Sequence, residues 1–135
     1  MKVIRLVCAE NIIRDIQTNQ IVVYNLYDEI KSTTYPILLN KFCIYVLASR
    51  EEGDSQNEYS CIFKIKNSEE ILFQDDFQLN FKDNQTAKSV IKFSGLAVPN
   101  SGDLKVEIYD NDGETLLNEY LILLSLRRIT KKISE

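Results

Sequence analysis

The chain has 135 residues, a length typical of one domain and sufficient for a core of its own. Its hydrophobic content of 44% and charged content of 27% are those of a globular protein, which excludes a disordered chain and a membrane-spanning one. The net charge of −4 disfavours binding to the phosphate backbone of a nucleic acid, so the expected partners are proteins or small ligands.

The N-terminal residues do not form the apolar core of a signal peptide, because charges interrupt every apolar run within a few residues. The three cysteines, Cys8, Cys43 and Cys61, are odd in number and far apart, whereas secreted domains usually pair their cysteines. These features predict a cytoplasmic protein that does not enter a membrane.

Apolar residues recur with a period of two more often than with helical spacing, which indicates strands. In chain order, the predicted strands cover residues 3–9, 21–26, 42–48, 59–66, 76–82, 88–93, 104–109 and 120–124. The first three and the last are apolar on both faces, which fits central strands or strands whose outer face meets a partner. The other four alternate, so each has one core face and one face toward water.

Turn residues separate these runs, among them the Asp-Gly pair within residues 110–114, which is typical of a tight hairpin. Strands and helices do not alternate, which disfavours a parallel α/β sheet. We therefore predict one all-β domain over residues 1–125, an antiparallel two-layer β-sandwich of about seven to nine strands, Ig-like or C2-like. Residues 126–135 are predicted as a basic C-terminal tail, with a short helix as the alternative.

Several segments resemble a family of small, uncharacterised bacterial β-sandwich proteins that is catalogued as a domain of unknown function. They are Leu-Val-Cys-Ala-Glu at residues 6–10, Asp15, residues 21–30, the Tyr35-Pro36 step, and residues 93–109 with their Pro-x-x-Gly turn. The resemblance covers roughly residues 1–125 and implies a bacterial origin and a sandwich fold. It implies no activity.

The chain contains no histidine, which excludes histidine-dependent hydrolases and proteases and histidine-ligated zinc sites. It also lacks the Cys-x-x-Cys spacing of zinc sites and the glycine-rich loops that cradle phosphates. Each cysteine lies inside an apolar run, where a thiol is expected to be buried and inert. We therefore predict no catalytic residue, no cofactor and no enzymatic activity.

Acidic residues around the predicted hairpin are the candidate metal ligands. Loops at one end of a sandwich converge, and clustered carboxylates there can bind calcium. The alternative is a solvated hairpin turn that binds nothing. The candidates are Asp103, Asp110, Asp112 and Glu114.

Two further sets of residues are candidate contacts for a partner. Tyr109 and Tyr120 flank the acidic hairpin and would form an aromatic pair on a sheet face if both project outward. Their alternative is cross-strand pairing that stabilises the sheet. Tyr45 and Leu47 would form an exposed apolar strip on strand 42–48 unless residues 11–16 or 28–33 of the same chain cover them.

These observations predict a non-enzymatic binding or protein-interaction module, with a protein partner that could be a second copy meeting it through an outer sheet face. The alternative is a calcium-binding C2-like module, or a carboxylate-based enzyme, built on the loop end that carries Asp103 and Glu114.

Overall fold

The computed structural model describes residues 1–127, and within that range the chain consists of strands and turns without a helix. The strands are β1 (Lys2–Arg14), β2 (Ile21–Leu26), β3 (Glu29–Ser32), β4 (Ile37–Leu39), β5 (Phe42–Ser49), β6 (Glu58–Asn67), β7 (Glu70–Asn80), β8 (Thr86–Phe93), β9 (Leu96–Val98), β10 (Gly102–Asp110) and β11 (Leu116–Leu126).

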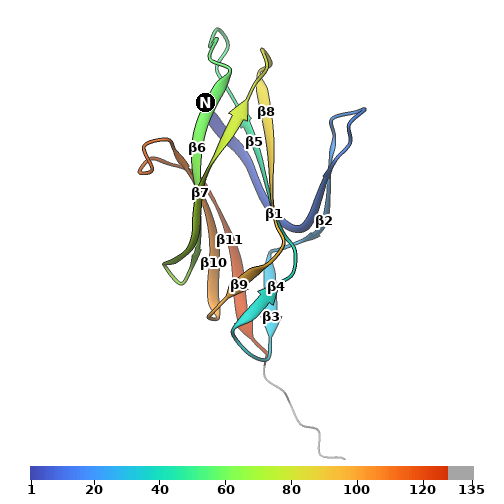
Figure 1. Ribbon diagram of the computed structural model, residues 1–135, viewed down its shortest axis with the longest axis vertical. Coiled ribbons are helices and arrows are strands. Elements are labelled where there is room, and N and C mark those ends of the chain that lie inside the picture. The colour runs from blue at the N-terminus through green and yellow to red at the C-terminus, as the bar shows by residue number, and fades with distance from the viewer. Residues whose placement is uncertain (128–135) are drawn as a thin grey trace, which may run out of the picture.

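The strands form two large sheets and one small ribbon, as Figure 1 shows. A four-stranded sheet has the order β2-β1-β5-β8, and a five-stranded sheet has the order β3-β11-β10-β6-β7. Strands β4 and β9 pair only with each other. Neighbouring strands are antiparallel except β3 and β11, which are parallel.

The core lies between the two large sheets and is filled by the apolar residues of their facing sides. On β10, Leu104, Val106 and Ile108 are fully buried, while Lys105 and Tyr109 lie on the opposite face. The inward residues of β6 and of the end of β7 are buried in the same cluster. The period-two pattern therefore identified these core faces correctly, because alternate side chains of a strand point to opposite sides of the sheet.

The all-β class is confirmed, but the predicted strand count of about seven to nine is too low, because the structure has eleven. All eight predicted runs form strands. The three strands that were not predicted are β3, β4 and β9, which have only three or four residues each. Such short segments contain too few residues to show a periodicity. The predicted basic tail and its alternative helix fall mainly on residues 128–135, outside the described part of the chain.

Strand β1 pairs with two strands along different parts of its length. Its first part pairs with β5 up to the register Ala9↔Cys43, and its second part pairs with β2 from Ala9↔Leu26 to Arg14↔Ile21. Figure 1 shows β1 bending where the pairing changes, so that the β1–β2 hairpin stands off from the sandwich beside the four-stranded sheet.

Side chains attach this hairpin to the outer face of β5 and β8, the other two strands of the same sheet. Ile12 is fully buried and packs in a second apolar cluster with Ala9, Cys43 and Tyr45. The Arg14 guanidinium donates a hydrogen bond of 3.0 Å to the Lys88 carbonyl. The Lys88 ammonium in turn donates one of 2.7 Å to the Asn19 carbonyl in the hairpin turn. The four-stranded sheet is thus covered on both faces around Tyr45.

A buried amide fixes the turn between β9 and β10. The Asn67 side chain is almost fully buried, and its Nδ2 donates hydrogen bonds of 2.9 Å to the carbonyls of Asn100 and Asp103. Its Oδ1 accepts a third from the Asn100 amide. One side chain therefore satisfies three backbone groups, which holds the start of β10 against the end of β6.

Candidate functional site

The acidic residues of the predicted calcium site do not converge. Asp110 is the last residue of β10 and Asp112 lies in the turn that follows, whereas Asp103 lies at the opposite end of β10. Asp110 is seven residue steps further along β10 than Asp103, which places them roughly 20 Å apart. Within residues 1–127, no group of three Cys, Asp or Glu side chains is arranged to hold a metal ion. Asp110, Asp112 and Glu114 therefore share one end of the molecule, but Asp103 lies at the other end and not beside them as expected.

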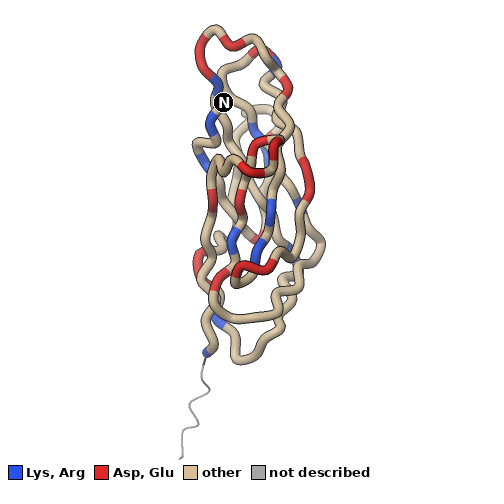
Figure 2. Tube along the Cα trace, turned by 90° about the vertical axis from the view of Figure 1, so that its left-hand side faces the viewer, with Lys and Arg blue, Asp and Glu red and all other residues tan. Residues whose placement is uncertain are grey.

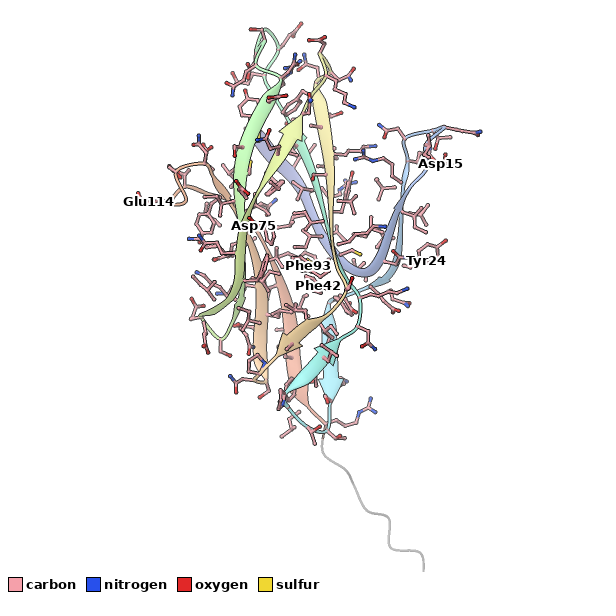
Figure 3. All side chains as sticks on the ribbon, viewed as in Figure 1. Asp15, Tyr24, Phe42, Asp75, Phe93 and Glu114 are labelled. Carbon is pink, nitrogen blue, oxygen red and sulfur yellow. The ribbon has the colours of Figure 1, made fainter. Side chains whose placement is uncertain are left out.

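The carboxylate of Asp112 serves the hairpin turn instead. Its Oδ1 accepts hydrogen bonds of 2.9 Å from the amides of Glu114 and Thr115, and its Oδ2 accepts one of 2.6 Å from the Thr115 hydroxyl. These hydrogen bonds lower the pKa of Asp112 below its usual value, and the bond from the Thr115 hydroxyl has the largest effect. Figure 3 shows Glu114 at the tip of the hairpin, away from the body of the molecule.

Tyr109 and Tyr120 lie on opposite faces of the five-stranded sheet, so they do not form the predicted pair. Tyr120 is in register with the buried Val106 and packs against the core, where its hydroxyl donates a hydrogen bond of 2.6 Å to the Tyr27 carbonyl. Tyr109 lies on the outer face, one register position beyond the core residue Ile108. The alternation along β10 already places Tyr109 outward, but the face of Tyr120 depends on its register with Val106, which the sequence alone does not show.

Polar groups on the outer face of the five-stranded sheet are paired with one another. The Lys66 ammonium lies 2.8 Å from the carboxylate of Glu107, and the Tyr109 hydroxyl donates a hydrogen bond of 3.0 Å to the same carboxylate. The Lys64 ammonium lies 4.2 Å from the centre of the Tyr109 ring. Figure 2 shows basic and acidic positions interspersed along this side of the molecule rather than gathered by sign. Such a face offers a charged ligand little unpaired charge.

The three cysteines are buried, as expected, and none forms a disulfide. Burial raises the pKa of Cys8 well above its usual value, and the neighbouring Cys43 adds to the shift. Burial and then the negative charge of Asp110 raise the pKa of Cys61 to about 11. Because the thiolate is the reactive form, these two thiols are poor nucleophiles near neutral pH.

Tyr45 and Leu47 lie under the β1–β2 hairpin. Tyr45 is only 6% exposed, because Ile12 and its neighbours cover it, which matches the alternative that residues 11–16 of the same chain bury this strip. Leu47 is half-buried. Both residues line a groove between the hairpin and the four-stranded sheet. Its full lining is Arg5, Val7, Gln20, Ile21, Val23, Tyr45, Leu47 and Lys88.

The hairpin covers the outer face of β5, and its own outer side exposes apolar side chains. Ile13 of β1 is in register with Val22 of β2, and these two side chains face away from the sandwich. Val22 is 43% exposed and Tyr24 is 52% exposed. Figure 3 shows the Tyr24 side chain projecting outward from β2. We call Ile13, Val22, Tyr24 and Leu26, together with the free edge of β2, the hairpin surface.

Strand β2 differs from the other edge strands of the two large sheets in that it carries no charge. The edges of the two large sheets are β2, β8, β3 and β7. Charged residues punctuate β7 and β8, and β3 has only four residues, two of them charged. Charge, shortness and proline are the usual means by which proteins prevent strand addition at an edge. Strand β2 has six residues, Ile-Val-Val-Tyr-Asn-Leu, without a charge or a proline, and the positive φ of Asn25 interrupts only its last part.

Residues 21–26 are one of the runs that are apolar on both faces, but Val22 and Tyr24 are not among the predicted contact residues. The same signal appears in β5, whose residues are buried on both sides. Only the sheet order distinguishes the two strands, since β5 has neighbours on both sides and β2 has one.

Comparison with known proteins adds no relative: no protein-family model and no curated protein sequence matches the chain. The predicted membership of the bacterial family therefore stays a prediction. Among the described residues, no helix has the length and hydrophobicity needed to cross a membrane.

Proposed function

We propose that the protein is a non-enzymatic protein-interaction module, which binds a partner strand through the hairpin surface. The observation that carries the proposal is the free edge of β2, an exposed strand of six residues without a charge. An exposed edge strand supplies backbone donors and acceptors that another strand can satisfy, and alternate side chains supply selectivity. The apolar side chains of Val22 and Tyr24 would then lose their contact with water.

A binding role is also supported by the chemistry of the chain. It has no histidine to serve as a general base near neutral pH. Burial raises the pKa values of Cys8 and Cys61, which disfavours a cysteine nucleophile at either position. An apolar edge held firmly by Ile12 and Arg14 suits recognition, because a preorganised surface loses little conformational freedom on binding.

The proposal can be tested by placing a photo-crosslinking amino acid at Tyr24 in cells that produce the protein. We expect discrete crosslinked species of higher mass, in which the partner is either another protein or a second copy. The matched control is the same amino acid at Leu38 of β4, which is also apolar and exposed but lies outside the hairpin surface. The absence of adducts at position 24, or the same adducts at position 38, would contradict the proposal.

A further inference from the structure

The charged residues of the four-stranded sheet are almost all basic, although the chain as a whole carries a net charge of −4. Its strands contain one acidic residue, Glu10, whose carboxylate accepts a hydrogen bond of 2.8 Å from the Asn25 side chain. The other charged residues of these strands are Lys2, Arg5, Arg14, Lys88 and Lys92. This sheet therefore carries a positive charge that its own strands do not balance.

Two of these basic residues lie on either side of the groove between the hairpin and the sheet. Leu47 is in register with Arg5 on β1 and with Lys88 on β8, so the three residues form one row across the outer face. Two strand spacings separate Arg5 from Lys88, which is about 10 Å. Both residues line the groove together with the inner side of β2. We call it the basic groove.

No carboxylate of residues 1–127 compensates these two cations. Three hollows on this side of the molecule include Lys88, and none is lined by an aspartate or a glutamate of the described chain. Neither Arg5 nor Lys88 forms an ion pair with any described residue. On the five-stranded sheet, by contrast, Lys66 and Lys105 each lie 2.8 Å from a carboxylate oxygen.

The acidic residue of the hairpin turn is used by the turn itself. Asp15 follows Arg14 in the chain, but its Oδ1 accepts hydrogen bonds of 2.9 and 3.3 Å from the amides of Gln17 and Thr18. Figure 3 shows Asp15 near the tip of the hairpin. The hairpin therefore does not supply the basic groove with a negative charge.

Backbone carbonyls hold two cations beside the groove in fixed positions. The Lys88 ammonium donates to the Asn19 carbonyl, and the Arg14 guanidinium donates to the Lys88 carbonyl. Each group keeps further N–H donors for a ligand. Burial raises the pKa of Tyr45, and the positive charges of Arg5 and Arg14 act against this rise, so their field reaches the floor of the groove.

We propose that the basic groove binds an acidic, extended segment of a partner protein, with its carboxylates against Arg5 and Lys88 and its apolar side chains against Leu47, Ile21 and Val23. The lining supports this class of ligand, because cations stand on either side of an apolar floor. A carboxylate that meets a cation forms a charge-assisted hydrogen bond, which is stronger than a neutral one. The groove is a second site, since it uses the inner side of β2 and not its free edge.

Other polyanions fit this groove less well. Tyr45, the aromatic residue of its lining, is only 6% exposed and cannot stack on a nucleic-acid base. The net charge of −4 also opposes the approach of a phosphate backbone. A lipid bilayer is flat, and Figure 1 shows the hairpin standing off from the sheet, where it would hold such a surface away from the groove.

Selection from a displayed library of random peptides tests the proposal. We expect the peptides retained by the unchanged chain to contain aspartate and glutamate more often than the library does, and their binding to weaken as the salt concentration rises. The double variant R5Q with K88Q should bind the selected peptides at least about tenfold more weakly in fluorescence anisotropy, because two charge-assisted hydrogen bonds are lost.

The matched control is the double variant K31Q with K105Q, which removes the same charge from β3 and β10 of the five-stranded sheet. It should bind the selected peptides as the unchanged chain does. Thermal unfolding checks that both double variants are folded.

Three results would overturn the acidic segment as the occupant. They are a selection without enrichment of acidic residues, equal binding of the selected peptides to the R5Q, K88Q variant, and tighter binding of single-stranded DNA or of anionic lipid vesicles that depends on the same two residues. The crosslinker at Tyr24 reports on the hairpin surface separately. Adducts at position 24 together with a failed selection would therefore reject the basic groove alone and leave the proposed function standing.

Discussion

The buried Cys61 thiol and the partly buried Tyr120 phenol lose their protons less readily in the folded chain than they do in water. Burial is the main cause for both. The pKa of Cys61 rises from an ordinary 9.0 to about 11, and that of Tyr120 rises from 10.0 to about 12. The negative charge of Asp110 adds to the first shift, and nearby Cys8 and Asp28 add to the second. Folding is therefore coupled to protonation in the alkaline range.

Stability should consequently fall as the pH rises above about 9. In that range the unfolded chain releases the Cys61 proton while the folded chain keeps it, so the unfolded state gains free energy by ionising. The free energy of unfolding, measured by urea titration from about pH 8 to about pH 11, should decline less steeply in a Cys61→Ala variant than in the unchanged chain. Parallel declines in the two proteins would contradict this account of the thiol.

At the scale of the elements, the β1–β2 hairpin depends on one face of β1. Ile12 points toward the four-stranded sheet and is fully buried, while the adjacent Ile13 points outward and is 43% exposed. Both residues are isoleucines of β1, but their side chains contact different surroundings. They therefore provide a comparison between an anchoring residue and a surface residue.

Replacing Ile12 by alanine should cost about 2–5 kcal/mol, because it removes buried methylene groups and leaves a cavity between the hairpin and Tyr45. Replacing Ile13 by alanine should cost less than about 1 kcal/mol, because much of that side chain already contacts water. Urea unfolding gives the two values. Faster amide hydrogen exchange along β2 in the Ile12 variant would show that the hairpin itself has loosened. Equal losses for both variants would mean that Ile12 does not anchor the hairpin.

Much of the fold could be predicted from the sequence, since the alternation of Leu104, Val106 and Ile108 with polar residues follows directly from strand geometry. The position of each strand within its sheet could not be predicted. The runs that became β2 and β5 look alike in the sequence, yet one is an edge and the other is central. The prediction that Asp103 and Asp110 lie together was wrong for a related reason. Residues a few positions apart along one extended strand are far apart in space.

At the scale of the whole molecule, the long strand β1 connects the core between the two sheets to the exposed edge strand β2. The first part of β1 lies inside the sandwich, and its second part carries the hairpin that covers Tyr45 and presents β2 outward. The apolar residues of β5 are mostly buried within the chain, whereas those of β2 are mostly exposed to water. The charged edges β7 and β8 leave β2 as the long edge without protection. Our account therefore assigns association to this edge.

Amide hydrogen exchange of the isolated protein tests this assignment most directly. Edge amides without a partner exchange quickly, and pairing with a neighbouring strand slows them. We predict that the peptide covering residues 21–26 of β2 exchanges more quickly than the peptide covering residues 42–49 of β5, which has a neighbouring strand on both sides. Equal exchange in the two peptides, or faster exchange in β5, would contradict the account.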